Sequence, residues 1–122
     1  MKLLMIYSDH FAWRTTEKGL ETAATVSEER RLEGVLVGMI HAEAQDEEDV
    51  GRVETKLVKN LKWGARKNQT LRILLHSFSH LAETKAAPEC TKALLDRAEA
   101  RLLAAGYQVW QTPFGYFHDL DL

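Results

Sequence analysis

The sequence has 122 residues, of which 45% are hydrophobic and 28% charged, a composition typical of a globular domain and not of a disordered chain. The formal net charge of −2 gives no overall basicity that would indicate a nucleic-acid partner. No apolar run approaches the roughly 20 residues that span a bilayer, so we expect no membrane segment. The single cysteine, Cys90, excludes an internal disulfide and a cysteine-cluster metal site.

The length fits one compact domain over residues 1–122, and the sequence contains no repeat, low-complexity tract or linker. The apolar N-terminus, residues 1–6, is too short for a signal peptide, and no small-residue cleavage site follows it. We therefore expect a cytoplasmic protein.

The first part of the chain predicts two core strands. Residues 2–8 form a nearly continuous apolar run, and Phe11 and Trp13 continue it with alternation, so this strand either runs on or turns back. Residues 15–33 are polar and charged, which predicts a loop or a short helical excursion. Residues 34–42 predict the second strand.

Two helices and a third strand come next. The acidic stretch 43–49 suits the positive end of a helix dipole and opens a helix predicted over residues 49–67. Residues 71–76 predict a buried strand. Pro88 then opens a second helix over residues 88–105, which ends before a glycine.

The last two strands are predicted over residues 107–111 and 116–120, joined across a turn. The order of elements predicts an α/β fold, a single-domain two-layer sandwich with one mixed sheet and two main helices.

The first predicted helix has two different faces. At about 100° per residue, its apolar side chains fall on one face and its basic side chains on the other, with Trp63 among the basic ones. A cationic stripe with an aromatic residue can track a phosphate backbone and stack a base. The alternative is a solvated outer face on which Trp63 packs against lysine stems or a second subunit. The candidate nucleic-acid contacts are Arg52, Lys56, Lys59, Lys62, Trp63 and Arg66.

The turn at Pro113–Gly115 is stiff, because proline fixes one dihedral angle and glycine permits a positive one. Aromatic residues surround this turn and His118 follows it, an arrangement that could clamp a base or a ribose. The alternative is a hairpin whose aromatic side chains simply fill the core.

His76 and His80 are four residues apart, a spacing that suits zinc on a helix. They fall on a strand pattern and lack the general-base glutamate, so we expect no metal site. His80 is placed for ligand contact at a strand end, or it is a satisfied structural histidine.

Covalent catalysis has little support in the sequence. There is no Gly-x-Ser-x-Gly elbow and no glycine-rich phosphate loop. Cys90 lies near a helix start, where the dipole could activate a thiol, but a lone cysteine is more often an inert buried residue. We expect no cofactor.

Four segments, in order, resemble the editing domain of archaeal-type threonyl-tRNA synthetase, whose fold is that of D-aminoacyl-tRNA deacylases. Residues 1–9 and 33–40 are similar to the first two strands of that family. Ser77-Phe78-Ser79-His80-Leu81-Ala82 resembles its Phe-Ala-His-Leu motif, and Thr112-Pro113-Phe114-Gly115-Tyr116-Phe117 resembles its Pro-Phe-Gly-Tyr-Tyr motif. The matches cover nearly the whole chain.

The resemblance implies a trans-editing deacylase that hydrolyses seryl-tRNA(Thr). A synthetic site cannot exclude serine well, because one missing methyl group is worth only about 1–3 kcal/mol. In the family, main-chain groups line the pocket and the terminal ribose hydroxyl of the tRNA assists attack by water. The implied substrate-binding residues are Ala42, Ser79, Phe114, Tyr116 and Phe117, and the implied catalytic residues are His80 and His118.

The resemblance also implies a homodimer, with tRNA(Thr) mischarged with serine as substrate and a synthetase lacking its own editing domain as a candidate partner. His118 stands where the family has a functional lysine, and the sequence stops at Leu122, before the position of a further family glutamate. Two alternatives stay open. One is a non-catalytic relative that binds tRNA, an aminoacyl-nucleoside-like ligand or a partner protein, and the other is a structural dimerisation domain.

Overall fold

The computed structural model describes residues 1–18, 29–78 and 84–121. Its elements in chain order are β1 (Lys2–Lys18), β2 (Glu29–His41), the 3₁₀ helix η1 (Ala44–Glu48), α1 (Val50–Lys67), β3 (Arg72–Ser77), α2 (Pro88–Ala104), β4 (Gln108–Gln111) and β5 (Tyr116–Asp121). Five strands form one sheet in the order β4-β3-β2-β1-β5. The pairs β2–β3 and β3–β4 are parallel, and β1 pairs antiparallel with both β2 and β5.

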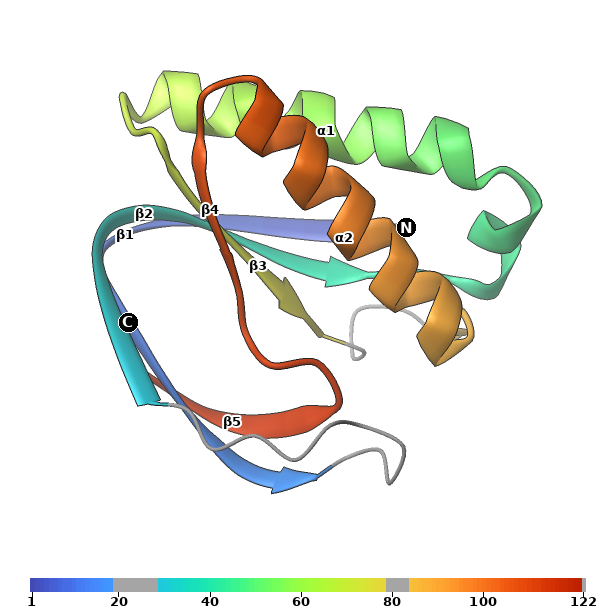
Figure 1. The fold of residues 1–122 in the computed structure, drawn as a ribbon, viewed down its shortest axis with the longest axis horizontal. Coiled ribbons are helices and arrows are strands. Elements are labelled where there is room, and N and C mark those ends of the chain that lie inside the picture. The colour runs from blue at the N-terminus through green and yellow to red at the C-terminus, as the bar shows by residue number, and fades with distance from the viewer. Residues whose placement is uncertain (19–28, 79–83, 122) are drawn as a thin grey trace.

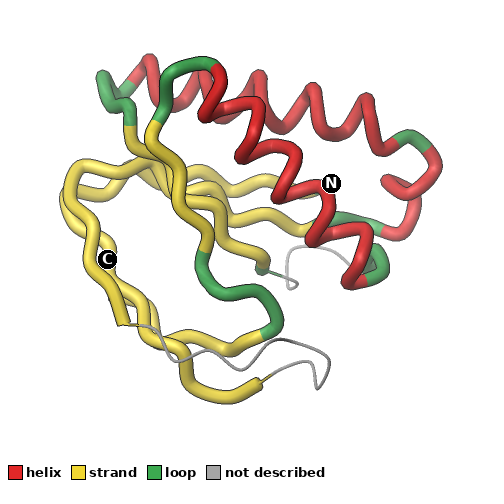
Figure 2. The backbone as a smooth tube through the Cα atoms, in the orientation of Figure 1, coloured by secondary structure: helices red, strands yellow, loops and turns green. Residues whose placement is uncertain are grey.

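Both helices cover the same face of the sheet, which gives two layers (Figures 1 and 2). The predicted α/β fold with a mixed sheet and two helices is confirmed. Within the described ranges, no helix is long and apolar enough to cross a membrane.

The main core lies between the helices and the sheet. From α1 it takes Leu57, Leu61 and Ala65, which are fully buried because they share the helix face that meets β2 and β3. Leu94 and Leu102 bring α2 into the same cluster. This face carries the apolar side chains, so the basic residues of α1 are left on the opposite face.

A second core fills the other face of the sheet, where β1 and β2 curl over (Figure 1). Its largest members are Phe11 and Trp13, whose ring centroids lie 6.2 Å apart. Ile6 packs against the same cluster, although strict alternation along a strand would place Ile6 and Phe11 on opposite faces. A corner between them reverses the facing of the strand.

Gly34 forms this corner on β2. Its φ is +58°, a backbone conformation that residues other than glycine rarely adopt. Two side chains next to the start of β3 hold it. The Thr70 hydroxyl donates to the carbonyl of Gly34 at 2.7 Å, and the Arg72 guanidinium donates to the carbonyl of Glu33 at 2.8 Å.

The expectation of a loop or helical excursion over residues 15–33 is wrong at both ends. Residues 15–18 belong to β1 and residues 29–33 to β2, and Arg14 pairs with Glu29. Polar side chains are compatible with a strand here because hydrogen bonds to β2 and β5 hold this part of β1. The strand at 2–8 therefore runs on through Phe11 and Trp13 instead of turning back.

Candidate functional site

The ends of β2, β3 and β4 meet at one end of the sheet, and the chain segments that leave them are tied together by backbone hydrogen bonds. The amide of Phe78 donates to Ile40 at 2.9 Å, and the amide of Ala86 donates to Ala42 at 2.8 Å. The amide of Thr112 donates to Leu75 at 3.2 Å. These bonds fix the exits of three strands relative to one another, as a site made of main-chain groups requires.

Two buried histidines add side-chain ties at this end. His41 Nε2 lies 2.6 Å from the carbonyl oxygen of Thr84, and His76 Nδ1 lies 2.8 Å from the hydroxyl of Thr112. Both rings are almost fully buried, at 2% and 5% exposed. A buried imidazole needs hydrogen-bond partners, so each is a structural link between a strand and the segment that crosses its end.

The structure brings two of the predicted substrate-binding residues to this end. Ala42 is buried at the end of β2, and Phe114 is half-buried and packs against the same core cluster. Phe114 lies in the turn before Gly115, whose φ of +84° fits the expected need for glycine. Both residues contact the main core cluster, and their joint role in one pocket stays a prediction.

The structure describes the other predicted catalytic and substrate-binding residues only in part. Ser79 and His80 lie outside the described residues. The backbones of Tyr116, Phe117 and His118 form part of β5, where His118 pairs with Thr15, and their side chains lie outside the described part.

Cys90 does not have the environment of an activated thiol. Its pKa is raised by burial, and the neighbouring Glu47 carboxylate raises it further. A thiolate is the nucleophilic form, so this environment disfavours nucleophilic chemistry. Among the residues that the structure describes, no group of three or more histidine, cysteine, aspartate or glutamate side chains could hold a metal ion.

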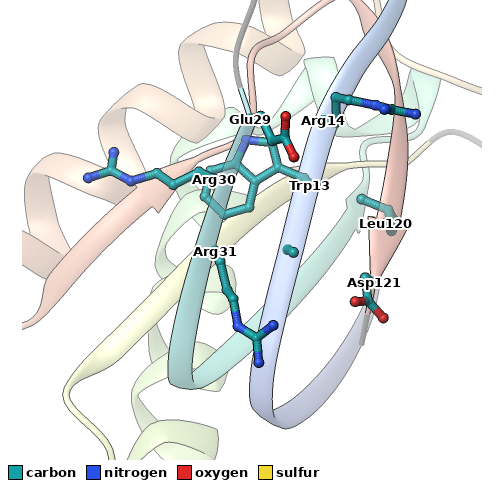
Figure 3. Close-up of a pocket in the computed structure, with 8 residues that line it drawn as sticks. Trp13, Arg14, Glu29, Arg30, Arg31, Leu120 and Asp121 are labelled. Atoms are coloured by element: carbon teal, nitrogen blue, oxygen red, sulfur yellow. The ribbon is translucent and has the colours of Figure 1, made fainter.

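A pocket of about 490 Å³ lies away from this end, on the curled part of β1, β2 and β5. Its lining residues are Ala12, Trp13, Arg14, Glu29, Arg30, Arg31, Leu120 and Asp121. The three guanidinium groups extend in different directions and do not converge on one point (Figure 3). Two carboxylates also line the pocket, so its charge does not single out an anionic ligand.

The outer face of α1 carries the other predicted contact set. Arg52, Lys56, Lys59, Trp63 and Arg66 are exposed, and Lys62 is half-buried. The Lys67 ammonium lies 5.1 Å from the centre of the Trp63 ring. The expected division between a buried apolar face and a basic face is therefore present.

Neither the contact between His41 and Thr84 nor the three arginines that line the pocket were predicted from the sequence. Arg14, Arg30 and Arg31 line the same pocket because the backbone of residues 12–14 pairs with that of residues 29–31. Pairing residues 12–14 antiparallel with residues 29–31 would have predicted that these arginines lie close together. The polar composition of residues 29–31 did not indicate a strand.

The sequence profile of the archaea-specific editing domain of threonyl-tRNA synthetase matches residues 1–122, the whole chain. The chain belongs to this family. It is 32% identical to the threonine–tRNA ligase of Thermococcus kodakarensis and 30% identical to that of Methanosphaera stadtmanae, and each alignment includes 100% of the chain. The chain spans about a fifth of the length of these relatives, 20% in both cases.

Membership in the editing-domain family supports a proofreading role in the context of tRNA and threonyl-tRNA synthetase. Two of the four family-like segments, residues 77–82 and 112–117, follow β3 and β4 in the chain at this end of the sheet. The 490 Å³ pocket and the outer face of α1 lie elsewhere on the fold.

Proposed function

We propose that this chain is an editing deacylase that hydrolyses the ester bond of seryl-tRNA(Thr) and releases serine and tRNA(Thr). The observation that carries the proposal is the match of the editing-domain family over residues 1–122. The firmly tied strand ends at Ala42 and Thr112 add support, because a main-chain site must be pre-organised to discriminate between two small amino acids.

In the proposed reaction, main-chain groups of Ala42, Ser79 and Phe114 hold the aminoacyl group, with Tyr116 and Phe117 beside the terminal nucleoside. The terminal ribose hydroxyl of the tRNA orients the attacking water. His80 and His118 position this water or stabilise charge on the carbonyl oxygen. Such a scheme needs no thiolate nucleophile, which agrees with the raised pKa of Cys90.

The test is hydrolysis of seryl-tRNA(Thr) and threonyl-tRNA(Thr) by the purified chain under single-turnover conditions. We expect faster hydrolysis of the seryl ester, and we expect the chain to remove serine in trans when it is added to a synthetase that lacks an editing domain. Hydrolysis of both esters at the rate of buffer would refute the proposal.

One observation favours a second function. His118 occupies the position of the family lysine, and an imidazole is only partly charged near neutral pH. A relative that binds tRNA or an aminoacyl-nucleoside-like ligand without cleaving it would tolerate this replacement. Protection of seryl-tRNA(Thr) from hydrolysis by the chain would identify that function.

We also propose that the chain forms a homodimer. β5 pairs with β1 only between Ala12 and Lys18, so residues 2–9 of β1 have an open edge within the described part of the sheet. Leu4 and Tyr7 on this segment are 44% and 41% exposed. An open strand edge with exposed apolar side chains is a template for pairing with a second chain.

A further inference from the structure

The two helices of this protein carry very different charge. α1 has six lysine or arginine residues and one acidic residue, whereas α2 has three basic and three acidic residues. The whole chain is slightly acidic, with a net charge of −2. The basic side chains are therefore concentrated on α1 instead of being spread evenly over the surface.

The basic side chains of α1 are not engaged by carboxylates of the residues that the structure describes. Within the described residues, no ion pair involves Arg52, Lys56, Lys59, Lys62, Arg66 or Lys67. The one acidic residue of the helix, Glu54, is turned toward α2, where its carboxylate binds Arg97 at 2.5 Å and Arg101 at 3.1 Å. The acidic residue within α1 therefore pairs with α2 and not with the basic residues of its own helix.

The residues from Arg52 to Arg66 that carry positive charge form a row along the outer face of α1, which we call the cationic row. Trp63 lies within this row and is 56% exposed. Lys67 covers part of its ring. An exposed indole between cations offers a flat surface on which a base can stack while phosphates contact the neighbouring side chains.

We infer that the outer face of α1 is the surface on which this protein binds the phosphate backbone of tRNA. The choice of tRNA as the nucleic acid rests on the proposed function. Residues one helical turn apart are separated by about 5.4 Å, and the row from Arg52 to Arg66 extends over roughly 21 Å at 1.5 Å per residue. A row of this length can contact several consecutive phosphates.

The position of α1 suits an RNA whose 3′ end enters the candidate site. η1 connects the N-terminal end of α1 to Ala42, and Glu47 of η1 accepts a hydrogen bond from the amide of Ala87 at 3.3 Å. The first turns of α1 therefore belong to the same end of the molecule as the exits of β2 and β3 (Figure 1). The cationic row leads from that end along the helix.

An anionic membrane fits this helix less well than RNA does. A helix that lies in a membrane interface inserts its apolar face into the lipid. The apolar face of α1, with Leu57, Leu61 and Ala65, is already buried in the core. Only the charged face remains available.

The test measures binding of fluorescently labelled, deacylated tRNA to the purified chain by anisotropy at several salt concentrations. The α1 variant combines Lys56→Gln, Lys59→Gln and Arg66→Gln. A matched control removes three exposed cations elsewhere, Lys2→Gln, Arg31→Gln and Lys92→Gln, with the same change in net charge. A third variant, Trp63→Ala, removes the stacking surface. Circular dichroism verifies that each variant folds.

We expect the α1 variant to bind tRNA at least tenfold more weakly at about 0.1 M salt. Its slope of log affinity against log salt should fall in magnitude by about 2–3, because about 0.7–0.9 counterion is released for each phosphate contact. Trp63→Ala should weaken binding about fivefold or more with an unchanged slope. The control should lose less than threefold.

Equal losses in the α1 variant and the control would overturn the inference. The inference would also be overturned if the wild type did not bind tRNA but used the same cations to bind anionic vesicles or an acidic protein. Hydrolysis assays separate this inference from the proposed function. The α1 variant should lose kcat/KM on seryl-tRNA(Thr) but not on a seryl ester of the 3′-terminal trinucleotide. If the wild type cleaves neither substrate while tRNA binding still depends on α1, the proposed function fails and the binding surface stands.

Discussion

The amine of Met1 is held by two carboxylates beside the end of β2. It lies 2.7 Å from Glu43 Oε2 and 2.7 Å from Asp46 Oδ2, and Asp46 also accepts from the amide of Glu43. Burial disfavours the charged amine, but the hydrogen bonds to Asp46 and Glu43 outweigh burial and raise its pKa above the ordinary 8.0. The pKa of Glu43 is lowered, mainly by its hydrogen bond to this amine. The cluster anchors the start of β1 to η1.

We predict that Asp46→Asn lowers the free energy of unfolding by about 1–2 kcal/mol, because it weakens a charge-assisted hydrogen bond. The effect should depend on pH. The raised pKa of the amine gives stability that is complete below pH 8.0 and is lost as pH rises through the folded-state pKa. The lowered pKa of Glu43 gives stability that is present above 4.5 and is lost as pH falls.

Urea unfolding of the wild type and of Asp46→Asn between pH 4 and 10 measures this effect. The difference between the two proteins should be complete below about pH 8 and should shrink as pH rises through the raised pKa of the amine. A difference that stays constant across the whole range would show that the amine does not contribute.

At the candidate site, His118 is the residue whose replacement is most informative, because the motif resemblance puts it where the family would have a lysine. We predict that His118→Ala lowers single-turnover hydrolysis of seryl-tRNA(Thr) about 10²-fold or more if the imidazole takes part in proton transfer. His118→Lys should retain activity because it restores the family residue. Equal rates for the wild type and His118→Ala would assign His118 no catalytic role.

At the scale of elements, the contact between α1 and β2 depends on small residues. A Cβ added to Gly64 would lie 3.0 Å from Leu36 and 3.0 Å from the sulfur of Met5. A Cβ added to Gly51, in the first turn of the same helix, would meet nothing within 4 Å. The two glycines of one helix therefore have opposite roles, one in packing and the other without a packing partner.

We predict that Gly64→Val destabilises the protein by about 1–3 kcal/mol, because the branched side chain would push α1 away from β2. Gly51→Ala should stabilise it by up to about 1 kcal/mol, because alanine loses less conformational entropy in a helix. Thermal and urea unfolding of both variants provides the comparison. Destabilisation by Gly51→Ala would argue against an open surface at that position.

At the scale of the whole molecule, the open edge of β1 determines the proposed assembly. Only residues 12–18 of β1 pair with β5, and Leu4 and Tyr7 remain exposed on the free segment. Pairing of two such edges about a twofold axis would bring Leu4 and Tyr7 next to side chains of the second chain.

We predict a dimer mass by light scattering at micromolar concentration for the wild type. Leu4→Glu combined with Tyr7→Glu should shift the mass to that of a monomer, because like charges would face each other across the edge. Leu103→Glu is the matched control, since Leu103 is 51% exposed on α2 and lies outside the β1 edge. Loss of the dimer in the control as well, or a wild-type monomer, would rule out this edge.

Local patterns in the sequence determined the order of strands and helices, the buried face of α1 and the membership of the family. Residues such as Leu57 and Leu61 repeat with the helical period, and a period of this kind can be read without knowing any distant contact. The family-like motifs at 77–82 and 112–117 are also local, so the resemblance that assigns Phe114 to the candidate site needs no knowledge of distant contacts.

Only the tertiary structure decided how far β1 and β2 extend and where their side chains point. Residues 15–18 and 29–33 are polar, and pairing with distant partners makes them strand, as in the pair formed by Thr15 and His118. The corner at Gly34 then turns Phe11 and Trp13 into a second core that alternation along one strand could not predict. Strand pairing and bends are non-local, because their hydrogen bonds join residues far apart in the chain. The tie between His41 and Thr84 has the same origin, since it joins residues 43 positions apart.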